Sequence, residues 1–393
     1  MRSLLLAAAL GLPAVATAQI LNVHAFNTSG HPAQAIWTPD GQHVLVTITR
    51  HPIESGIEVF RVDGPKLKRV AWQPLGHEPA QGIVLIPDTG LVAVGLTNGG
   101  VVFLSLEATL QGNADPHVIS QGDHPGSSYL AVTPKGDHLF VSNEILHGGS
   151  VGIIAIRRDP KGHPIPEPVA QLPTPVATAG ITLSPNGTRL YAVNDVLAKD
   201  LPERLPGNDI PELHHGNCVH EAGGPINING GLYVIDVAKA SAPPTDYSPQ
   251  HERDATLRLF SAGCSPIREV VSSDGRTLYV SARGDDSVLV FDTAALEHDP
   301  EHAFLRSMET NGIAPVGLGL FDHDRKLLVA NSNQFSLTPG NATVIDLTDP
   351  EKPTFLQTIK TGFYPHDITV SPDGRSMLLT AYLEDQLMLL TMK

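Results

Sequence analysis

The chain has 393 residues, which is enough for one large domain or for two to three of average size. A hydrophobic fraction of 41% with 17% charged residues is typical of a folded protein and excludes a disordered one. The formal net charge of −15 offers no basic surplus for phosphates, so it argues against nucleic acid or an anionic membrane surface as a partner.

The N-terminus has the pattern of a secretory signal peptide. Arg2 provides a short positive region, residues 4–12 an apolar core, and residues 16–18 a cleavage site of small side chains. The apolar run is too short for a stable membrane span, and no later stretch reaches eighteen apolar residues. We therefore expect cleavage near Ala18 and an exported mature chain, either periplasmic or extracellular.

A tight-turn sequence recurs along the rest of the chain. Its first copy is "TPDGQHVLVT" and its last is "SPDGRSMLLT"; the copies centre on Gly41, Gly90, Gly136, Gly187, Gly275, Asp324 and Gly374. Successive spacings are 49, 46, 51, 88, 49 and 50 residues, so an insertion of about forty residues lies in the long interval. Five of the seven turns contain Pro, which pre-sets φ, and six contain Gly, which accepts a positive φ.

Each repeat unit divides into four strand-sized pieces. The third piece is the clearest and occurs at 56–60, 101–106, 151–156, 231–236, 287–292 and 342–347. A weaker fourth piece ends in a Gly-x-x-Pro-like turn, at 30–32, 76–79, 122–125, 263–266, 312–315 and 362–365, with 173–176 as a degenerate member. A period near fifty with four strands per unit predicts a β-propeller.

The two ends of the chain complete one another. The seventh unit stops after its third strand, "QLMLLTMK", while "ILNVHAFNTSGHP" after the signal peptide reads as an orphan fourth strand. The N-terminal strand should therefore complete the last blade and close the ring, which leaves no open edge. The predicted fold is all-β: a single seven-bladed propeller over residues 19–393.

These motifs resemble a known family. The pattern of a Gly-x-x-Pro turn, the S-P-D-G hairpin with "LYVS" after it, and a V-x-V-(I/F)-D strand is similar to YVTN-type propellers. These propellers group with the lactonase-like propellers related to 6-phosphogluconolactonase. The resemblance implies a lactone-opening or lactone-forming enzyme as one possibility, and a ligand- or surface-binding ring as the other. Its motifs are turn and core residues, so they specify architecture and not activity.

Ligands of propellers normally bind where the turns between blades and the loops after second strands converge on the central channel. A lactone hydrolase needs a base to activate water and donors to hold the developing oxyanion. Polar side chains fall at these places, although His and Asn in turns often only cap backbone groups. We expect catalytic residues among His366, Glu144, Arg268 and His220, and substrate-binding residues among Arg283, Asp195, Asn194, Gln81 and Asp367.

The insertion, at about 196–230, occupies the loop after the second strand of blade four and should fold over the channel face. It contains "HHGNCVHE", whose His214, His215 and His220 are weak candidates for a metal site, because no second ligand group follows at a standard spacing. Cys218 has a better partner in Cys264, in the turn that enters blade five. We predict a disulfide there, which would contribute about 3–4 kcal/mol.

Three function classes stay open from the sequence. The first is an exported hydrolase or cyclase acting on a small lactone or organic acid, and the second is a non-catalytic ring that binds a ligand or a protein partner. A metal-dependent oxidoreductase that uses the histidines is the third. The one G-x-S-x-G match, "GGSVG" at 148–152, leads into the strand-sized piece at 151–156 and not into a helix, so it lacks the strand–turn–helix context of a serine hydrolase. No H-E-x-x-H motif occurs, so zinc-protease chemistry has no support. We expect a monomer without a cofactor, and glycosylation of the Asn27, Asn186 and Asn341 sequons only in a host that glycosylates.

Overall fold

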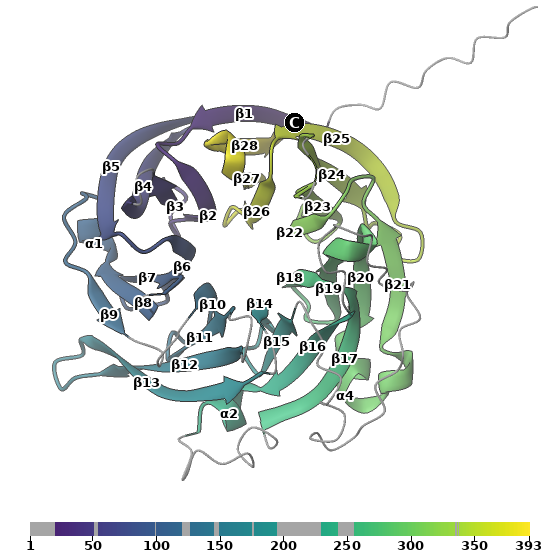
Figure 1. Ribbon diagram of the computed structural model, residues 1–393, viewed down its shortest axis with the longest axis horizontal. Helices are drawn as coiled ribbons and strands as arrows, with labels where there is room; N and C mark the ends of the chain where they lie inside the picture. Colours follow the sequence, from purple (N-terminus) through teal and green to yellow (C-terminus); the bar gives the residue numbers. More distant parts are fainter. Residues whose placement is uncertain are drawn as a thin grey trace, which may run out of the picture.

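The strands form seven four-stranded antiparallel sheets arranged in a ring around a central axis (Figure 1). The computed structural model describes residues 20–50, 54–98, 100–119, 126–144, 149–174, 177–194, 229–242, 255–334, 336 and 338–393. The predicted all-β propeller of seven four-stranded blades is confirmed. The predicted signal peptide and almost all of the predicted insertion lie outside the described residues.

Each blade runs outward from an inner strand beside the axis. The inner strands are β2 (His31–Trp37), β6 (Ala80–Ile86), β10 (Ser127–Val132), β14 (Thr178–Leu183), β18 (Pro266–Val271), β22 (Pro315–Phe321) and β26 (Pro365–Val370). The second strands are β3 (His43–Arg50), β7 (Leu91–Leu96), β11 (His138–Asn143), β15 (Arg189–Asn194), β19 (Thr277–Ala282), β23 (Lys326–Asn331) and β27 (Ser376–Ala381).

The outer half of each blade contains the third and fourth strands. The third strands are β4 (Glu54–Asp63), β8 (Gly100–Ser105), β12 (Ser150–Arg158), β16 (Asn229–Asp236), β20 (Ser287–Asp292), β24 (Gly340–Asp346) and β28 (Gln386–Met392). The fourth strands are β5 (Lys66–Gly76), β9 (His117–Ile119), β13 (Pro164–Pro173), β17 (Thr256–Cys264), β21 (Phe304–Glu309), β25 (Thr354–Gly362) and, for blade seven, β1 (Leu21–Asn27).

The N-terminal strand closes the ring as predicted. β1 pairs with β28 in an antiparallel register that runs from Leu21 opposite Met392 to Asn27 opposite Gln386. Leu21 is completely buried in a cluster with Phe321 of blade six and Leu390 of β28. The first and last strands of the chain are therefore neighbours in one sheet, and blade seven has no free outer edge at β28.

Neighbouring blades pack face to face through their apolar side chains. Leu232 of β16 shares one buried cluster with Val280 of β19 and Phe291 of β20, for example. Nearer the axis, glycines let inner strands approach: a Cβ on Gly82 would lie 2.6 Å from the Ser128 carbonyl oxygen, and one on Gly317 2.8 Å from that of His366. Side chains at the centre of the ring are therefore close enough to meet.

Short helices that the sequence did not predict follow several third strands. They are α1 (Leu106–Thr109), α2 (Val237–Ala240) and α4 (Thr293–His298), and they begin after Ser105, Asp236 and Asp292, whose side chains accept backbone N–H bonds as N-caps. The described residues also include three 3₁₀ turns: η1 (Arg283–Asp285), η2 (Pro300–His302) and η3 (Tyr382–Glu384). Across the described ranges, no helix is long and apolar enough to span a membrane.

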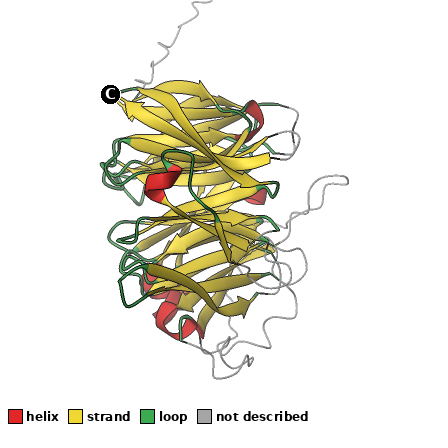
Figure 2. Ribbon diagram, turned by 90° about the vertical axis from the view of Figure 1, so that its left-hand side faces the viewer, coloured by secondary structure: helices red, strands yellow, loops and turns green. Residues whose placement is uncertain are grey.

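The ring has two different flat faces, which Figure 2 shows edge-on. The Pro-Asp-Gly hairpins that join inner to second strands lie on one face. Because successive strands are antiparallel, the turns between blades and the loops after second strands lie on the other. We call the second of these the channel face, since it carries the residues predicted to form a site.

Candidate functional site

The inner strands place four polar side chains at the centre of the ring. Every inner strand has a register shift against its second strand near its start. Two residues past the last paired position before this shift, the seven blades carry in order Gln34, Gly82, Tyr129, Gly180, Arg268, Gly317 and Asp367. Odd-numbered blades therefore contribute a polar side chain and even-numbered blades a glycine, which leaves room for the polar groups.

These four side chains interact across the axis. The Arg268 guanidinium carbon lies 3.2 Å from the centroid of the Tyr129 ring, a cation–π contact between blades five and three. Asp367 of blade seven is close enough for the positive charge of Arg268 to lower its pKa, and it hydrogen-bonds the side chain of Gln34. Burial is the larger effect: it raises the pKa of Asp367 to about 6 and lowers the pKa of Arg268 to about 10.

His366 is held neutral and in one tautomer. Its Nδ1 lies 3.0 Å from the Ala33 carbonyl oxygen, which can only accept, so we assign the ring hydrogen to Nδ1. Its Nε2 then accepts a hydrogen bond from the Tyr129 hydroxyl at 3.3 Å. Burial, together with the charge of Arg268, lowers the pKa of His366 to about 4. Both ring nitrogens are thus occupied at neutral pH.

Glu144 and Arg283 lie at the channel face, near enough for the charge of Arg283 to lower the pKa of Glu144. Glu144 directly follows β11, its N–H donates to the Gly126 carbonyl oxygen at 2.9 Å, and its Oε2 accepts from the Ser128 hydroxyl at 3.0 Å. Its side chain is exposed, but the surrounding protein removes part of its hydration and raises its pKa, an effect that Ser128 and the charge of Arg283 partly oppose. Arg283, in η1, donates to the Gln334 side chain at 3.0 Å.

An aromatic group that the sequence analysis missed borders the same place. Tyr364 has a φ of 54°, and its ring centroid is 5.3 Å from that of His366 and 5.7 Å from that of Tyr382. Burial raises the pKa of the Tyr364 hydroxyl, while the charges of Arg283 and Arg268 lower it. Tyr382 also stacks on His31, with centroids 5.0 Å apart. The available signal was the tyrosine directly before the proline in "GFYP", where the other turns between blades have smaller residues.

The other predicted site residues lie elsewhere or outside the described ranges. Asn194 is completely buried at the end of β15, and the Gln81 side-chain amide lies 3.5 Å from the Thr97 hydroxyl. Asp195, His214, His215, Cys218 and His220 are outside the described residues. Cys264 ends β17 and is 2% exposed, but the disulfide with Cys218 stays a prediction. Within the described ranges no group of His, Cys, Asp or Glu could hold a metal ion.

Glu269, next to Arg268, is a buried carboxyl whose two oxygens have no hydrogen-bond partner among the described residues. Burial raises its pKa well above the ordinary value, although the positive charge of Arg268 opposes this. As pH rises past the ordinary value, the unfolded chain loses this proton while the folded chain keeps it. Stability should therefore fall, at up to about 1.4 kcal/mol per pH unit, until the raised pKa is reached.

Glu269→Gln should remove this part of the pH dependence. We expect the free energies of unfolding of the variant and of the unmodified protein to converge near pH 4, with the variant increasingly more stable toward pH 8. Urea denaturation at several pH values measures this difference. The exposed Glu309→Gln controls for the loss of one charge. A constant offset between pH 4 and 8 would show that Glu269 ionises normally.

Comparisons with known proteins agree with the fold. The family described as "Lactonase, 7-bladed beta-propeller" matches residues 245–339, and so supports the resemblance over that part of the chain. No curated protein sequence matches significantly. Among solved structures, a chain of the "Crystal Structure of Mitotic Checkpoint Complex" is similar at 12% identity, with 100% of this chain and 99% of that chain covered and a TM-score of 0.64. A chain of Kuenenia stuttgartiensis hydrazine synthase is similar at 14% identity, with 93% and 96% covered and a TM-score of 0.61.

Proposed function

We propose that the protein hydrolyses a small lactone to its hydroxy acid, or runs the reverse ring closure, at the channel face. The observation that carries the proposal is the proximity of Glu144 and Arg283, which belong to different blades: the charge of Arg283 acts on Glu144 and lowers its pKa against the effect of desolvation. The partial match to seven-bladed lactonase propellers supports this reaction class.

The charge balance of the site suits a substrate that is or becomes an anion. Arg268 and Arg283 both contribute guanidinium groups, whereas burial raises the pKa of Glu269 well above its ordinary value and so favours its neutral form. Asp367, with a pKa of about 6, is mainly ionised at neutral pH. The centre of the ring is therefore more positive than a count of its carboxyl groups implies. A carboxylate product or an oxyanion would be attracted to it.

The reaction can be assigned to particular atoms. The Glu144 carboxylate takes a proton from water, and the water oxygen forms a bond to the ring carbonyl carbon. Arg283 donates hydrogen bonds to the oxyanion that develops. The ring C–O bond then breaks, and the leaving oxygen takes the proton back from Glu144, which completes the hydrolysis. His366 has no free ring nitrogen among its described contacts, so we assign it a positioning role with Tyr129.

Acid release from a panel of small lactones, followed in a pH-stat at neutral pH, tests the proposal. Release above the spontaneous rate for at least one lactone is the expected result. If no lactone is opened and no hydroxy acid is closed, the catalytic proposal fails.

One observation favours a second function, in which the ring binds a ligand without converting it. The half-buried rings of His31, Tyr364 and Tyr382 lie together at the same face, packed over the buried ring of His366, and form a surface on which a flat ligand can stack. Calorimetric titration with the hydroxy acids of the panel separates the two functions, because binding without turnover supports the second. In either case the signal peptide predicted at residues 1–18 would place the function outside the cytoplasm.

A further inference from the structure

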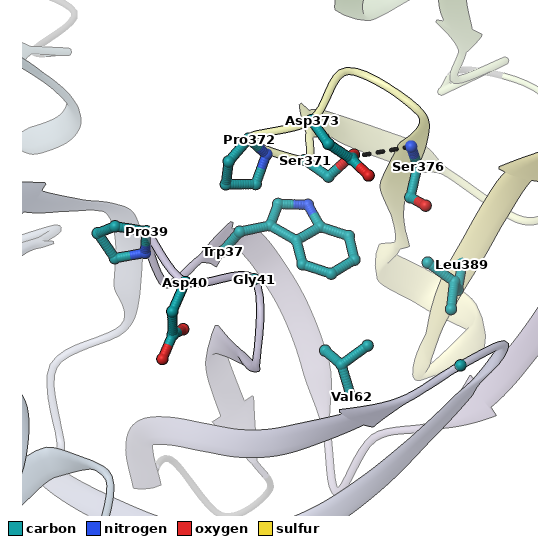
Figure 3. Close-up of a pocket in the computed structure, with 11 residues that line it drawn as sticks. Trp37, Pro39, Asp40, Gly41, Val62, Ser371, Pro372, Asp373, Ser376 and Leu389 are labelled. Atoms are coloured by element: carbon teal, nitrogen blue, oxygen red, sulfur yellow. Dashed lines mark hydrogen bonds between the residues drawn. The ribbon is translucent and has the colours of Figure 1, made fainter.

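A separate cavity of about 480 Å³ lies on the opposite face, at the seam where blade seven meets blade one. Trp37, the last residue of β2, lies between two hairpins, one with Pro39 and Asp40 from blade one and one with Pro372 and Asp373 from blade seven (Figure 3). None of these residues belongs to the channel-face site. The cavity is therefore independent of the proposed reaction.

The hairpins leave open space at this seam. At three other seams the hairpin glycine contacts the proline of the preceding blade: a Cβ on Gly187 would lie 2.6 Å from Pro134, one on Gly136 would meet Pro87, and one on Gly275 would lie 3.5 Å from Pro185. A Cβ on Gly41 would have no described atom within 4 Å, and the same is true of Gly90 and Gly374. What distinguishes the seam between blades seven and one is the indole of Trp37, which lies in this open space between the two hairpins.

Among the seven inner strands, only β2 ends in a tryptophan, so the wall of this cavity differs chemically from the corresponding place in the other blades. At the position of Trp37 the other six inner strands end in Ile86, Val132, Leu183, Val271, Phe321 and Val370. Trp37 is 8% exposed, and its Nε1 has no hydrogen-bond partner among the described residues. A buried indole N–H normally finds an acceptor, so this donor is suited to a ligand carbonyl oxygen.

Two carboxylates give the cavity a negative rim. Asp40 Oδ1 accepts from the Thr38 hydroxyl at 2.5 Å and the Gln42 N–H at 3.0 Å, and Asp373 Oδ1 accepts from the Ser371 hydroxyl at 2.5 Å and the Arg375 N–H at 3.1 Å. These contacts lower the pKa values of both groups, so both are ionised at neutral pH. No lysine or arginine is among the residues that line the cavity.

We infer that this seam binds an extended peptide segment of a partner protein that carries an arginine or lysine side chain. The cation would lie beside Asp40 and Asp373 and over the indole, and a backbone carbonyl of the same segment would accept from Trp37 Nε1. A peptide supplies both groups together, and a cavity of about 480 Å³ holds more than a single guanidinium group. The chain's formal net charge of −15 also favours a basic partner.

The two tryptophans of the chain allow a direct test. Protein labelled with ¹⁵N-tryptophan gives one indole N–H signal each for Trp37 and Trp72, and Trp72→Phe assigns them. Titration with the blocked pentapeptide Ala-Ala-Arg-Ala-Ala should move the Trp37 signal and leave the Trp72 signal in place, with weaker binding in added NaCl. Ala-Ala-Glu-Ala-Ala should move neither signal.

Asp→Asn variants in the two hairpins remove the negative charge but can keep the hydrogen bonds of the turn, so they test the charge alone. Asp40→Asn and Asp373→Asn should each weaken binding of the arginine peptide about fivefold. Asp274→Asn is the matched control, because Asp274 makes the same hairpin contacts with Ser272 and Arg276 in blade five, away from the cavity. The inference is overturned if the arginine peptide leaves the Trp37 signal unmoved, if the glutamate peptide moves it as far, or if the three variants behave alike. Equal movement with methylguanidinium alone would exclude the peptide as the ligand.

Discussion

Replacing Glu144 with glutamine should lower kcat for lactone hydrolysis by at least about a hundredfold, because a positioned general base typically contributes that much or more. The glutamine oxygen can still accept from the Ser128 hydroxyl, as Glu144 Oε2 does at 3.0 Å, so residue 144 should keep its place. KM should change little, since binding would depend on Arg283 and the aromatic rings. Initial-rate kinetics on the best lactone of the panel provide both constants.

The pH dependence of the same reaction should report the environment of Glu144. The base acts only when it is ionised, so the rate is present above its pKa and is lost as pH falls through that value. Because desolvation raises the pKa of Glu144, the loss should begin at a higher pH than for an ordinary glutamate. The residual rate of Glu144→Gln should lack this acidic limb.

Two further variants make the Glu144 assignment falsifiable. Glu384→Gln is the control. Among the described residues the Glu384 carboxylate accepts the Phe363 N–H at 2.9 Å on the same face, which a glutamine oxygen can also do, so this variant should keep full activity. His366→Gln should cost less than tenfold if His366 only positions its neighbours. A Glu144→Gln enzyme within about threefold of the original, or a His366→Gln enzyme as inactive as Glu144→Gln should be, would assign the base to another group.

The architecture could be predicted because short local sequence patterns specify it and recur in every blade. Each hairpin has a glycine or aspartate at a fixed period, and each apolar third strand is recognisable by itself; residues 287–292, for example, are β20 without adjustment. Ring closure followed from counting strands at the two ends. The short helices were missed because a terminal aspartate such as Asp292 ends a strand and caps a helix at once.

The site was less accessible to sequence reasoning, because its geometry depends on which blades face each other across the axis. His366, Arg268 and Asp367 were among the predicted residues, and the structure brings them together with Tyr129. Yet the role predicted for His366 changes with the environment that burial creates, and Tyr364 was not predicted at all. His366 uses both ring nitrogens in structural contacts, which no residue spacing reveals. Tyr364 reaches the site through a positive φ, which for a tyrosine is uncommon and unpredictable from its neighbours.

Removing residues 20–27 should abolish cooperative folding of the ring. Without β1, the backbone edge of β28 would be unpaired along its length, and the apolar cluster around Phe321 and Leu390 would lose Leu21. The seam to blade six would loosen too, because the Ile20 and Leu21 N–H groups donate to Gln357 Oε1 of β25, at 2.9 and 3.2 Å. Urea denaturation followed by circular dichroism, with sedimentation to detect aggregates through the exposed edge, measures the effect.

Point variants on β1 separate the contribution of apolar packing to this loss of stability from that of strand pairing. Leu21→Ala should lower the free energy of unfolding by about 2–5 kcal/mol, since it leaves a cavity at a fully buried position. Asn22→Ala, at the exposed neighbouring position of the same strand, is the matched control and should change it by less than about 0.5 kcal/mol. A synthetic peptide of residues 20–29 added to the truncated protein should restore part of the lost stability by pairing with β28. A truncated protein that unfolds at the same urea midpoint as the intact chain would mean that six complete blades hold the seventh without its outer strand.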